Sequence, residues 1–195
     1  MVPRILVLAG SLNFGSPANR LANAAQLVLA QRGAEVTRVS PLDHPLPMVT
    51  DGPNATVVPQ IAARLGDMIR HHDAVLISSP SLHDVVPPLL VNLIAWTARA
   101  SAGERPAQPW RDRVVGLVAA GGAEGEAGPV ADQLRRMLMR LDADVIAAQC
   151  CVGKSDLAFD EDGWPQDGQD RADLEKTCLQ LYERAQAFRK TTRPA

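Results

Sequence analysis

Long apolar runs are missing from this sequence. No segment approaches the roughly 20 apolar residues that a membrane-spanning helix needs, and residues 1–4 lead straight into a short apolar segment without the features of a signal peptide. Runs of one charge are missing too, since 20 Lys and Arg residues face 22 Asp and Glu residues, for a formal net charge of −2. We therefore expect no membrane and no nucleic acid among the partners.

Cysteine is scarce and odd in number, with 3 residues in a chain of 195. This usage suits a reducing, cytoplasmic environment and gives no disulfide framework. Cys150 and Cys151 are adjacent, but a vicinal disulfide is strained, so we expect buried thiols. A chain of this length does not need disulfide bonds to be stable, because one domain over residues 1–195 can bury a full core on both faces of a sheet.

Signatures of catalysis by side chains are also missing. The chain has no convincing Ser/His/Asp, Cys/His or metal-ligand spacing. The adjacent His71 and His72 fall between an expected helix and an expected strand, which is more typical of a helix end than of a metal site. We therefore expect no metal and no catalytic acid–base set.

What the sequence does contain is a regular alternation of apolar strands and amphipathic helices. Strands are expected at residues 4–9, 35–40, 73–79, 113–120 and 144–149, and helices at about 21–31, 57–70, 88–99, 127–141 and 171–188. Each connection between successive strands is long enough for a right-handed crossover. The pattern predicts an α/β fold in which helices cover both faces of an open, doubly wound, five-stranded parallel sheet.

The loop after the first expected strand has the composition of a phosphate site. It opens at Gly10 and leads into a helix, whose unpaired backbone amides and dipole favour an anion. The side chains able to add hydrogen bonds or charge are Ser11, Asn13, Ser16, Asn19 and Arg20. The loop has neither a Walker A lysine nor the glycine spacing of a dinucleotide fingerprint, so a mononucleotide is the expected ligand. The alternative is that Ser16 or Asn19 only caps the helix.

Two more loops fall at the same edge of the predicted sheet. Ligands of doubly wound sheets bind outside the carboxyl ends of the strands, so the loops after the first, third and fourth strands should converge on one pocket. The third-strand loop, Pro80–Pro87, offers backbone amides to the polar edge of a flat heterocycle, while Leu82 and His83 can pack on its face. The alternative for His83 is a loop histidine without a role.

Five segments of the chain share their pattern with one known family. They are Gly10-Ser11-Leu12 with Ser16 and Asn19-Arg20-Leu21; Leu46-Pro47-Met48 with Asp51; Pro80, His83, Pro87, Leu90, Asn92, Ile94 and Trp96; Gly121-Gly122; and residues 158–163. Together they resemble the NADPH-dependent FMN reductase family over nearly the whole chain. The first segment is similar to that family's phosphate loop, and the third segment is the most specific.

The resemblance implies a flavodoxin-like fold with strand order 2-1-3-4-5 and an FMN cofactor. The first loop would hold the FMN phosphate, and the isoalloxazine would lie between the third-strand and fourth-strand loops. The implied cofactor-binding residues are Ser11, Asn13, Ser16, Asn19, Arg20, Pro80, Ser81, Leu82, His83, Ala120, Gly121 and Gly122. NADPH or NADH would reduce the flavin, and the flavin would reduce a small acceptor such as free flavin or a quinone, so no side chain needs to be catalytic. The resemblance also implies a homodimer or homotetramer.

The chain departs from that family at several positions of the implied site. Asn13 stands in place of an arginine, which removes a charge-assisted phosphate contact of about 1.5–3 kcal/mol. Ser81 and Leu82 replace a Glu-Tyr pair, and Asp84 replaces a glycine. Two alternatives therefore stand beside the reductase: a flavodoxin-type electron carrier, and a flavin-free binding or assembly protein that has kept the fold.

Overall fold

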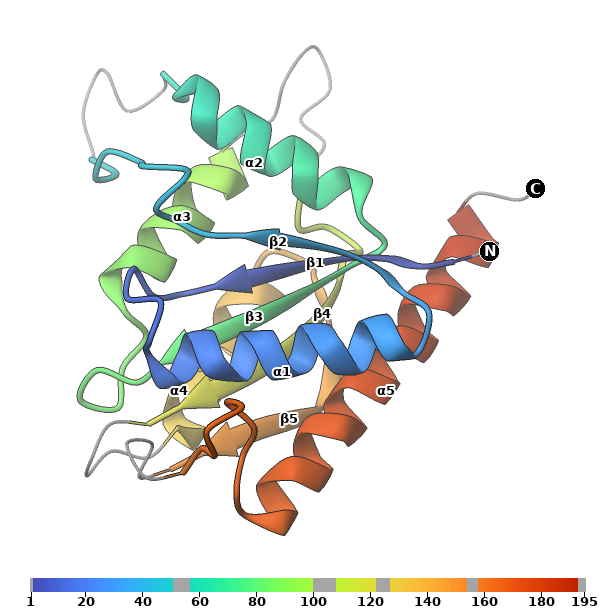
Figure 1. Ribbon diagram of the computed structural model, residues 1–195. Coiled ribbons are helices and arrows are strands. Elements are labelled where there is room, and N and C mark those ends of the chain that lie inside the picture. The colour runs from blue at the N-terminus through green and yellow to red at the C-terminus, as the bar shows by residue number, and fades with distance from the viewer. Residues whose placement is uncertain (1, 51–56, 100–107, 122–126, 154–157, 193–195) are drawn as a thin grey trace.

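The computed structural model describes residues 2–50, 57–99, 108–121, 127–153 and 158–192 (Figure 1). Its five strands form one parallel sheet with the order β2-β1-β3-β4-β5, which confirms the predicted architecture and strand order. The strands are β1 Arg4–Ala9, β2 Glu35–Val39, β3 Ala74–Pro80, β4 Val114–Ala120 and β5 Asp144–Val152. The helices are α1 Pro17–Gln31, α2 Gln60–His71, α3 Pro88–Arg99, α4 Gly128–Met139 and α5 Gly168–Thr192.

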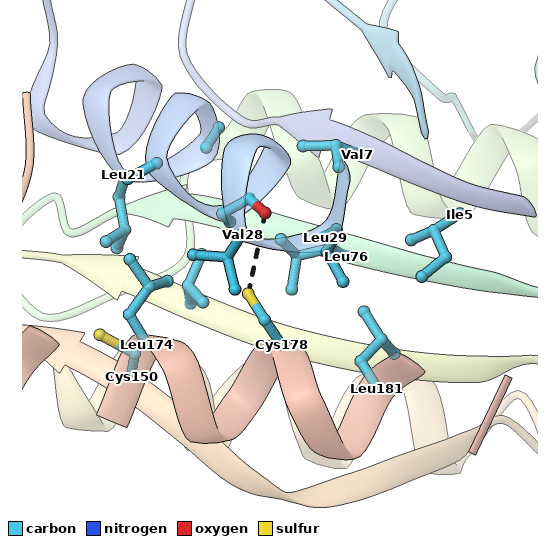
Figure 2. Close-up of a cluster of buried hydrophobic side chains, with 14 of the residues drawn as sticks. Ile5, Val7, Leu21, Val28, Leu29, Leu76, Cys150, Leu174, Cys178 and Leu181 are labelled. Carbon is cyan, nitrogen blue, oxygen red and sulfur yellow. Dashed lines mark hydrogen bonds between the residues drawn. The ribbon is translucent and has the colours of Figure 1, made fainter. Parts of the chain in front are cut away.

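Two apolar layers sandwich the sheet because its central strands are apolar on both faces. Ile5 and Val7 of β1 point toward α1 and α5, where they join a buried cluster with Leu21, Leu29 and Leu181 (Figure 2). The alternate residues of β1 point to the opposite face, under α2, α3 and α4. This alternation of successive side chains is the two-residue period of a strand, and it explains why nearly every position of β1 is buried.

One predicted helix begins later than the sequence pattern suggests. The apolar stripe predicts a helix from Val57, but α2 begins at Gln60, with Pro59 in an extended conformation at its N-cap. A proline disfavours helical backbone in the residue before it, so Val58 cannot extend the helix backwards. The other end of α2 is close to its predicted position.

Strand β5 is longer than predicted because it contains an irregularity. Val115 pairs with Val145 and Leu117 pairs with Gln149, so β5 carries two more residues than β4 over this interval. The bulged backbone is bonded from both faces of the sheet. Arg135 of α4 donates to the carbonyl of Ile146 at 2.7 Å, and the side chain of Gln180 in α5 accepts from the amide of Ala148 at 3.1 Å.

The three cysteines are free thiols that lie in or beside the core. Cys150 and Cys178 are buried, and the thiol of Cys178 donates to the carbonyl oxygen of Ala25 at 3.8 Å (Figure 2). Cys151 is half-buried. Burial raises the pKa of all three thiols, to about 11 for Cys151 and about 12 for Cys178.

Candidate functional site

The carboxyl ends of the strands bring the predicted loops to one edge of the sheet. The arrowheads of the strands point to the same side of Figure 1, where the loops after β1 and β3 gather. Strand β1 lies between β2 and β3, so the order of the strands reverses direction beside it. Such a switch point opens a crevice for ligands in doubly wound sheets.

Short local hydrogen bonds shape the loop after β1. The side chain of Asn13 accepts from the amide of Gly15 at 3.0 Å, and the hydroxyl of Ser11 accepts from the amide of Asn13 at 3.2 Å. Ser16 is the N-cap of α1, its hydroxyl accepting from the amide of Asn19 at 3.2 Å. Pro17 follows at the first helical position, where the missing N–H costs nothing.

The side chain of Asn19 connects two backbone carbonyl groups of this loop. Its side chain is 3 % exposed, and its amide nitrogen donates to the carbonyl oxygens of Asn13 at 2.6 Å and Ser11 at 3.2 Å. Its amide oxygen accepts from the guanidinium of Arg38 at 2.6 Å. Because both ends of the Asn19 side chain are bonded inside the protein, its role is to position the loop.

Arg38 is a residue that the sequence pattern did not identify. It lies on β2 opposite Val7, and burial lowers its pKa by penalising the charged form. Its guanidinium reaches Asn19, so it brings a positive charge beneath the loop in which Asn13 replaces the family's arginine. The sequence did contain one signal for Arg38, since it is an arginine within a strand that borders the switch point.

The loop leaves a set of hydrogen-bond donors for a ligand. The amides of Ser11, Leu12, Phe14 and Ala18 donate to nothing within the described part of the chain. The hydroxyls of Ser11 and Ser16 act as acceptors toward the loop, so their hydrogens are available to a ligand. Arg20 is exposed and makes no ion pair or hydrogen bond with its side chain among the described residues. This set fits a phosphate at a helix N-terminus.

Gly10 lets the loop pack directly against α3. A Cβ atom at this position would lie 2.5 Å from Cδ1 of Leu90 and 3.0 Å from the carbonyl oxygen of Ser78. The hydroxyl of Ser78 donates to the carbonyl of Ala18 at 2.7 Å, which ties the start of α1 to β3. Three elements, α1, α3 and β3, thus fix the position of the loop after β1.

The loop after β3 is built around a tight turn from Leu82 to Val85. Two backbone hydrogen bonds of 3.3 Å and 3.2 Å close it, and its central residues His83 and Asp84 have φ angles of 52° and 60°. Gln133 of α4 braces the turn by donating to the carbonyl of Asp84 at 2.8 Å. Glycine is the residue that adopts these angles without strain, so Asp84 holds a backbone shape suited to the glycine that the family has there.

Ser81 contributes an unsatisfied polar group at the start of this turn. Its amide donates to the carbonyl of Ala120 at 2.8 Å, but its hydroxyl is buried and has no hydrogen-bond partner among the residues that the structure describes. Buried polar groups are nearly always paired, so an unpaired one at a ligand-binding edge fits a bound polar ligand. Leu82 and His83 are exposed beside it, and Pro80 is half-buried.

The loop after β4 is only partly described. Ala120 is 1 % exposed, and the amide of Gly121 donates to the carbonyl of Val152 at 2.7 Å, so both residues belong to the packed end of the sheet. Gly122 lies outside the described residues. The structure therefore brings the predicted loops after β1 and β3 together. Most of the loop after β4 lies outside the described residues.

Other features of the described residues do not compete with this site. A hollow of about 420 Å³ lies against Asp144, Ala147 and Gln180, at the amino-terminal half of β5 and the opposite end of the sheet. Within the same residues, no group of three His, Cys, Asp or Glu side chains is placed to hold a metal ion. None of the described helices is long and apolar enough to cross a membrane.

Several solved structures share this fold. A flavoenzyme NAD(P)H:(acceptor) oxidoreductase, FerB from Paracoccus denitrificans, has a TM-score of 0.72 and 19% identity, covering 96% of this chain and 99% of its own. RosB, with bound 8-demethyl-8-formylriboflavin-5′-phosphate, has a TM-score of 0.76 and 17% identity, covering 97% of this chain and 81% of its own. An archaeal flavodoxin has a TM-score of 0.60 and 9% identity, covering 94% and 98%.

No curated protein sequence matches the chain. The NADPH-dependent FMN reductase family matches residues 3–156, which include β1 through β5 and all three predicted loops. The strand-order reversal beside β1, the donor set at the start of α1 and the turn after β3 are thus features of a family member. The chain belongs to the NADPH-dependent FMN reductase family, a family of flavin-dependent NAD(P)H oxidoreductases with a flavodoxin-like fold.

Proposed function

We propose that the protein binds FMN at the edge formed by the loops after β1 and β3, and uses it to oxidise NADPH or NADH. The observation that carries this proposal is the presence of two sets of groups that have no partner within the described residues: the backbone amides at the start of α1 and the hydroxyl of Ser81 on the neighbouring loop. The first set suits a phosphate, and the second suits the polar edge of a ring. RosB supports the same reading, because its structure holds a flavin phosphate within the same fold.

Each loop has a distinct part in this proposal. The backbone amides around Ser11 and Ala18, the hydroxyl of Ser16 and the guanidinium of Arg20 hold the phosphate, while Asn19 and Arg38 keep the loop in shape. Pro80, Ser81, Leu82 and His83 would contact the isoalloxazine, with Ala120 and Gly121 at the neighbouring strand end. When bound, FMN supplies the redox chemistry, taking a hydride from NAD(P)H and passing electrons to a small acceptor.

The proposal is tested by the absorbance spectrum of the purified protein, by calorimetric titration with FMN, and by NAD(P)H oxidation with an added acceptor. We expect Arg20→Gln to weaken FMN binding about ten- to a hundredfold, because it removes a charged hydrogen-bond donor. Arg64→Gln is the matched control, since Arg64 is an exposed arginine on α2. It should leave the FMN affinity unchanged.

The outcomes separate the candidate functions. FMN binding together with NAD(P)H oxidation supports the reductase. Tight FMN binding without NAD(P)H oxidation would favour the flavodoxin-type carrier, and the absence of both would favour the flavin-free protein. If Arg20→Gln weakens FMN binding no more than Arg64→Gln does, the FMN phosphate does not bind at the loop after β1.

We also propose that the protein is cytoplasmic and a homodimer or homotetramer. Its three free thiols support the first point. Three exposed apolar residues support the second: Leu82 and Val85 in the turn are 48% and 49% exposed, and Val91 on α3 is 40% exposed. A partner subunit would cover such area next to the flavin edge.

A further inference from the structure

Arg38 is a positively charged side chain without a negatively charged partner in the described part of the chain. It lies in β2 on the face of the sheet that α1 covers, and its guanidinium donates to the amide oxygen of Asn19 at 2.6 Å. None of the ion pairs among the described residues includes Arg38. Burial lowers its pKa, but an arginine keeps its charge at neutral pH.

The charge of Arg38 exceeds what the loop after β1 needs for its shape. The amide oxygen of Asn19 needs only a hydrogen-bond donor, and a neutral side chain could supply one at a lower cost of desolvation. A charged donor becomes favourable at such a place when an anion binds nearby, because the attraction between the charges offsets the cost of burial. The contact between Arg38 and Asn19 therefore indicates an anion at this loop.

The side chain of Asn19 sets the direction of two peptide groups in the loop. Its amide nitrogen donates to the carbonyl oxygens of Ser11 at 3.2 Å and Asn13 at 2.6 Å. In a trans peptide the carbonyl and the N–H of the next residue point in opposite directions, and the described chain has no cis peptide bond. The amides of Leu12 and Phe14 therefore point away from Asn19, and neither has an acceptor among the described residues.

These two amides lie beside the N-terminus of α1. Ser16 caps this helix, and its hydroxyl oxygen lies 3.3 Å from the amide nitrogen of Asn19. The positive end of the helix dipole adds to the charge of Arg38 at this place. Directed amides together with a nearby cation favour an anion with a charge near −2, such as a phosphate monoester, over a neutral polar group.

We propose that Arg38 is a positioning and specificity-determining residue, which acts through Asn19 to make the site select FMN over riboflavin, the flavin that lacks the phosphate. The inference rests on the proposed function and assigns a source for the charge that Asn13 does not supply. Arg20 is exposed to solvent, whereas the partial burial of Arg38 reduces the screening of its charge.

Titrations with FMN and with riboflavin, followed by flavin fluorescence, test this role. Arg38→Gln should weaken FMN binding by about tenfold or more and change the riboflavin affinity by less than about threefold, because only FMN carries the phosphate. Arg38→Lys keeps a positive charge on a long side chain and should retain the FMN affinity within about threefold of the parent protein. Arg32→Gln is the matched control, because it removes an exposed arginine at the opposite end of α1 from Ser16, and it should change neither affinity.

Four results would overturn the proposal. Equal losses of FMN and riboflavin affinity in Arg38→Gln would indicate a general structural defect. An Arg38→Lys protein that binds FMN as weakly as Arg38→Gln would exclude the charge as the cause. An Arg38→Gln effect no larger than that of Arg32→Gln would exclude a role at the site. Failure of Arg38→Gln to fold would show that the cation serves the fold instead.

A second measurement separates this inference from the proposed function. Inorganic phosphate should raise the Tm of the FMN-free parent protein more than chloride does at equal ionic strength. Arg38→Gln should lose most of this difference, and Arg32→Gln should keep it. If the parent protein does not bind FMN, the proposed function is wrong, and the phosphate measurement alone decides the role of Arg38. In that case, the absence of a phosphate-specific shift, or an equal shift in Arg38→Gln, overturns the inference as well.

Discussion

Some polar side chains near the site form hydrogen bonds within the protein, and others are available to bond a ligand. The side-chain amides of Asn19 and Asn92 form hydrogen bonds with backbone groups of neighbouring loops, at donor–acceptor distances of 2.6–3.2 Å. Ser81 differs from them, because its buried hydroxyl has no partner in the described part of the chain. An asparagine bonded at both ends positions a loop, whereas the buried hydroxyl of Ser81 is available to a ligand at the candidate site.

The cysteines give a prediction that belongs to this scale. Burial, and then nearby carboxylates such as Asp132, raise the pKa of Cys151 from 9.0 to about 11. A thiol whose pKa is higher in the folded protein contributes stability that is complete below the unfolded pKa and is lost as the pH rises through the folded pKa. We expect the free energy of unfolding to fall between pH 9 and pH 11.

Cys151→Ala should make this decline shallower by up to about 1.4 kcal/mol per pH unit, the limit for one proton. Urea unfolding at a series of pH values measures the slope. Parallel curves for Cys151→Ala and the parent protein would show that this thiol does not ionise differently on folding.

At the scale of elements, the edge strand β5 contains a bulge, and side chains of the neighbouring helices form hydrogen bonds with its backbone. Its two additional residues break the ladder with β4, which leaves carbonyl groups without strand partners. Arg135 bonds the carbonyl of Ile146 at 2.7 Å and the side chain of Gln149 at 2.8 Å. A guanidinium suits this place because it presents several donors in a fixed plane.

Arg135→Leu should therefore lower the free energy of unfolding by about 0.5–1.5 kcal/mol, since it removes hydrogen bonds to partly buried acceptors. Chemical denaturation measures the change, and hydrogen exchange should show faster exchange in β5. Arg136→Leu is the control, because Arg136 is the exposed neighbour on the same helix, and it should stay within about 0.5 kcal/mol. Equal effects of the two variants would mean that the bulge does not depend on Arg135.

At the scale of the whole molecule, several exposed apolar residues lie at the proposed ligand-binding edge. Leu12 and Phe14 of the phosphate loop are 50% and 70% exposed, and Leu82 and Val85 of the adjoining turn are about half exposed. The edges of α/β sheets that bind ligands are also natural places for a second subunit, because contact there shields both the ligand and the apolar side chains.

We expect light scattering coupled to size-exclusion chromatography to give a mass of two or four chains, each of 20.9 kDa. Val91→Asp should shift the protein toward the monomer, because it places a charge on an apolar position of α3 that is 40% exposed. The matched control is Met139→Asp, on an exposed apolar residue at the end of α4. A parent protein that elutes as a monomer would contradict the proposed assembly.

Local pattern determined most of the fold. The two-residue and helical periods predicted all five strands and five helices, because each period reports which side chains a strand or helix buries. The errors have local causes: Pro59 delays α2, and the bulge lengthens β5 beyond its regular segment. The position of a bulge depends on the partner strand, which a single segment of sequence does not contain.

For the candidate site, the order of residues along the chain identifies the loops that carry the polar side chains, and the match over residues 3–156 shows the family that they belong to. The contacts of those side chains come from the folded structure. It turned Asn19 toward the loop, brought Arg38 from β2 into contact with Asn19, and left the hydroxyl of Ser81 without a partner among the described residues. These roles depend on contacts between residues distant in the chain, which periodicity and composition do not encode.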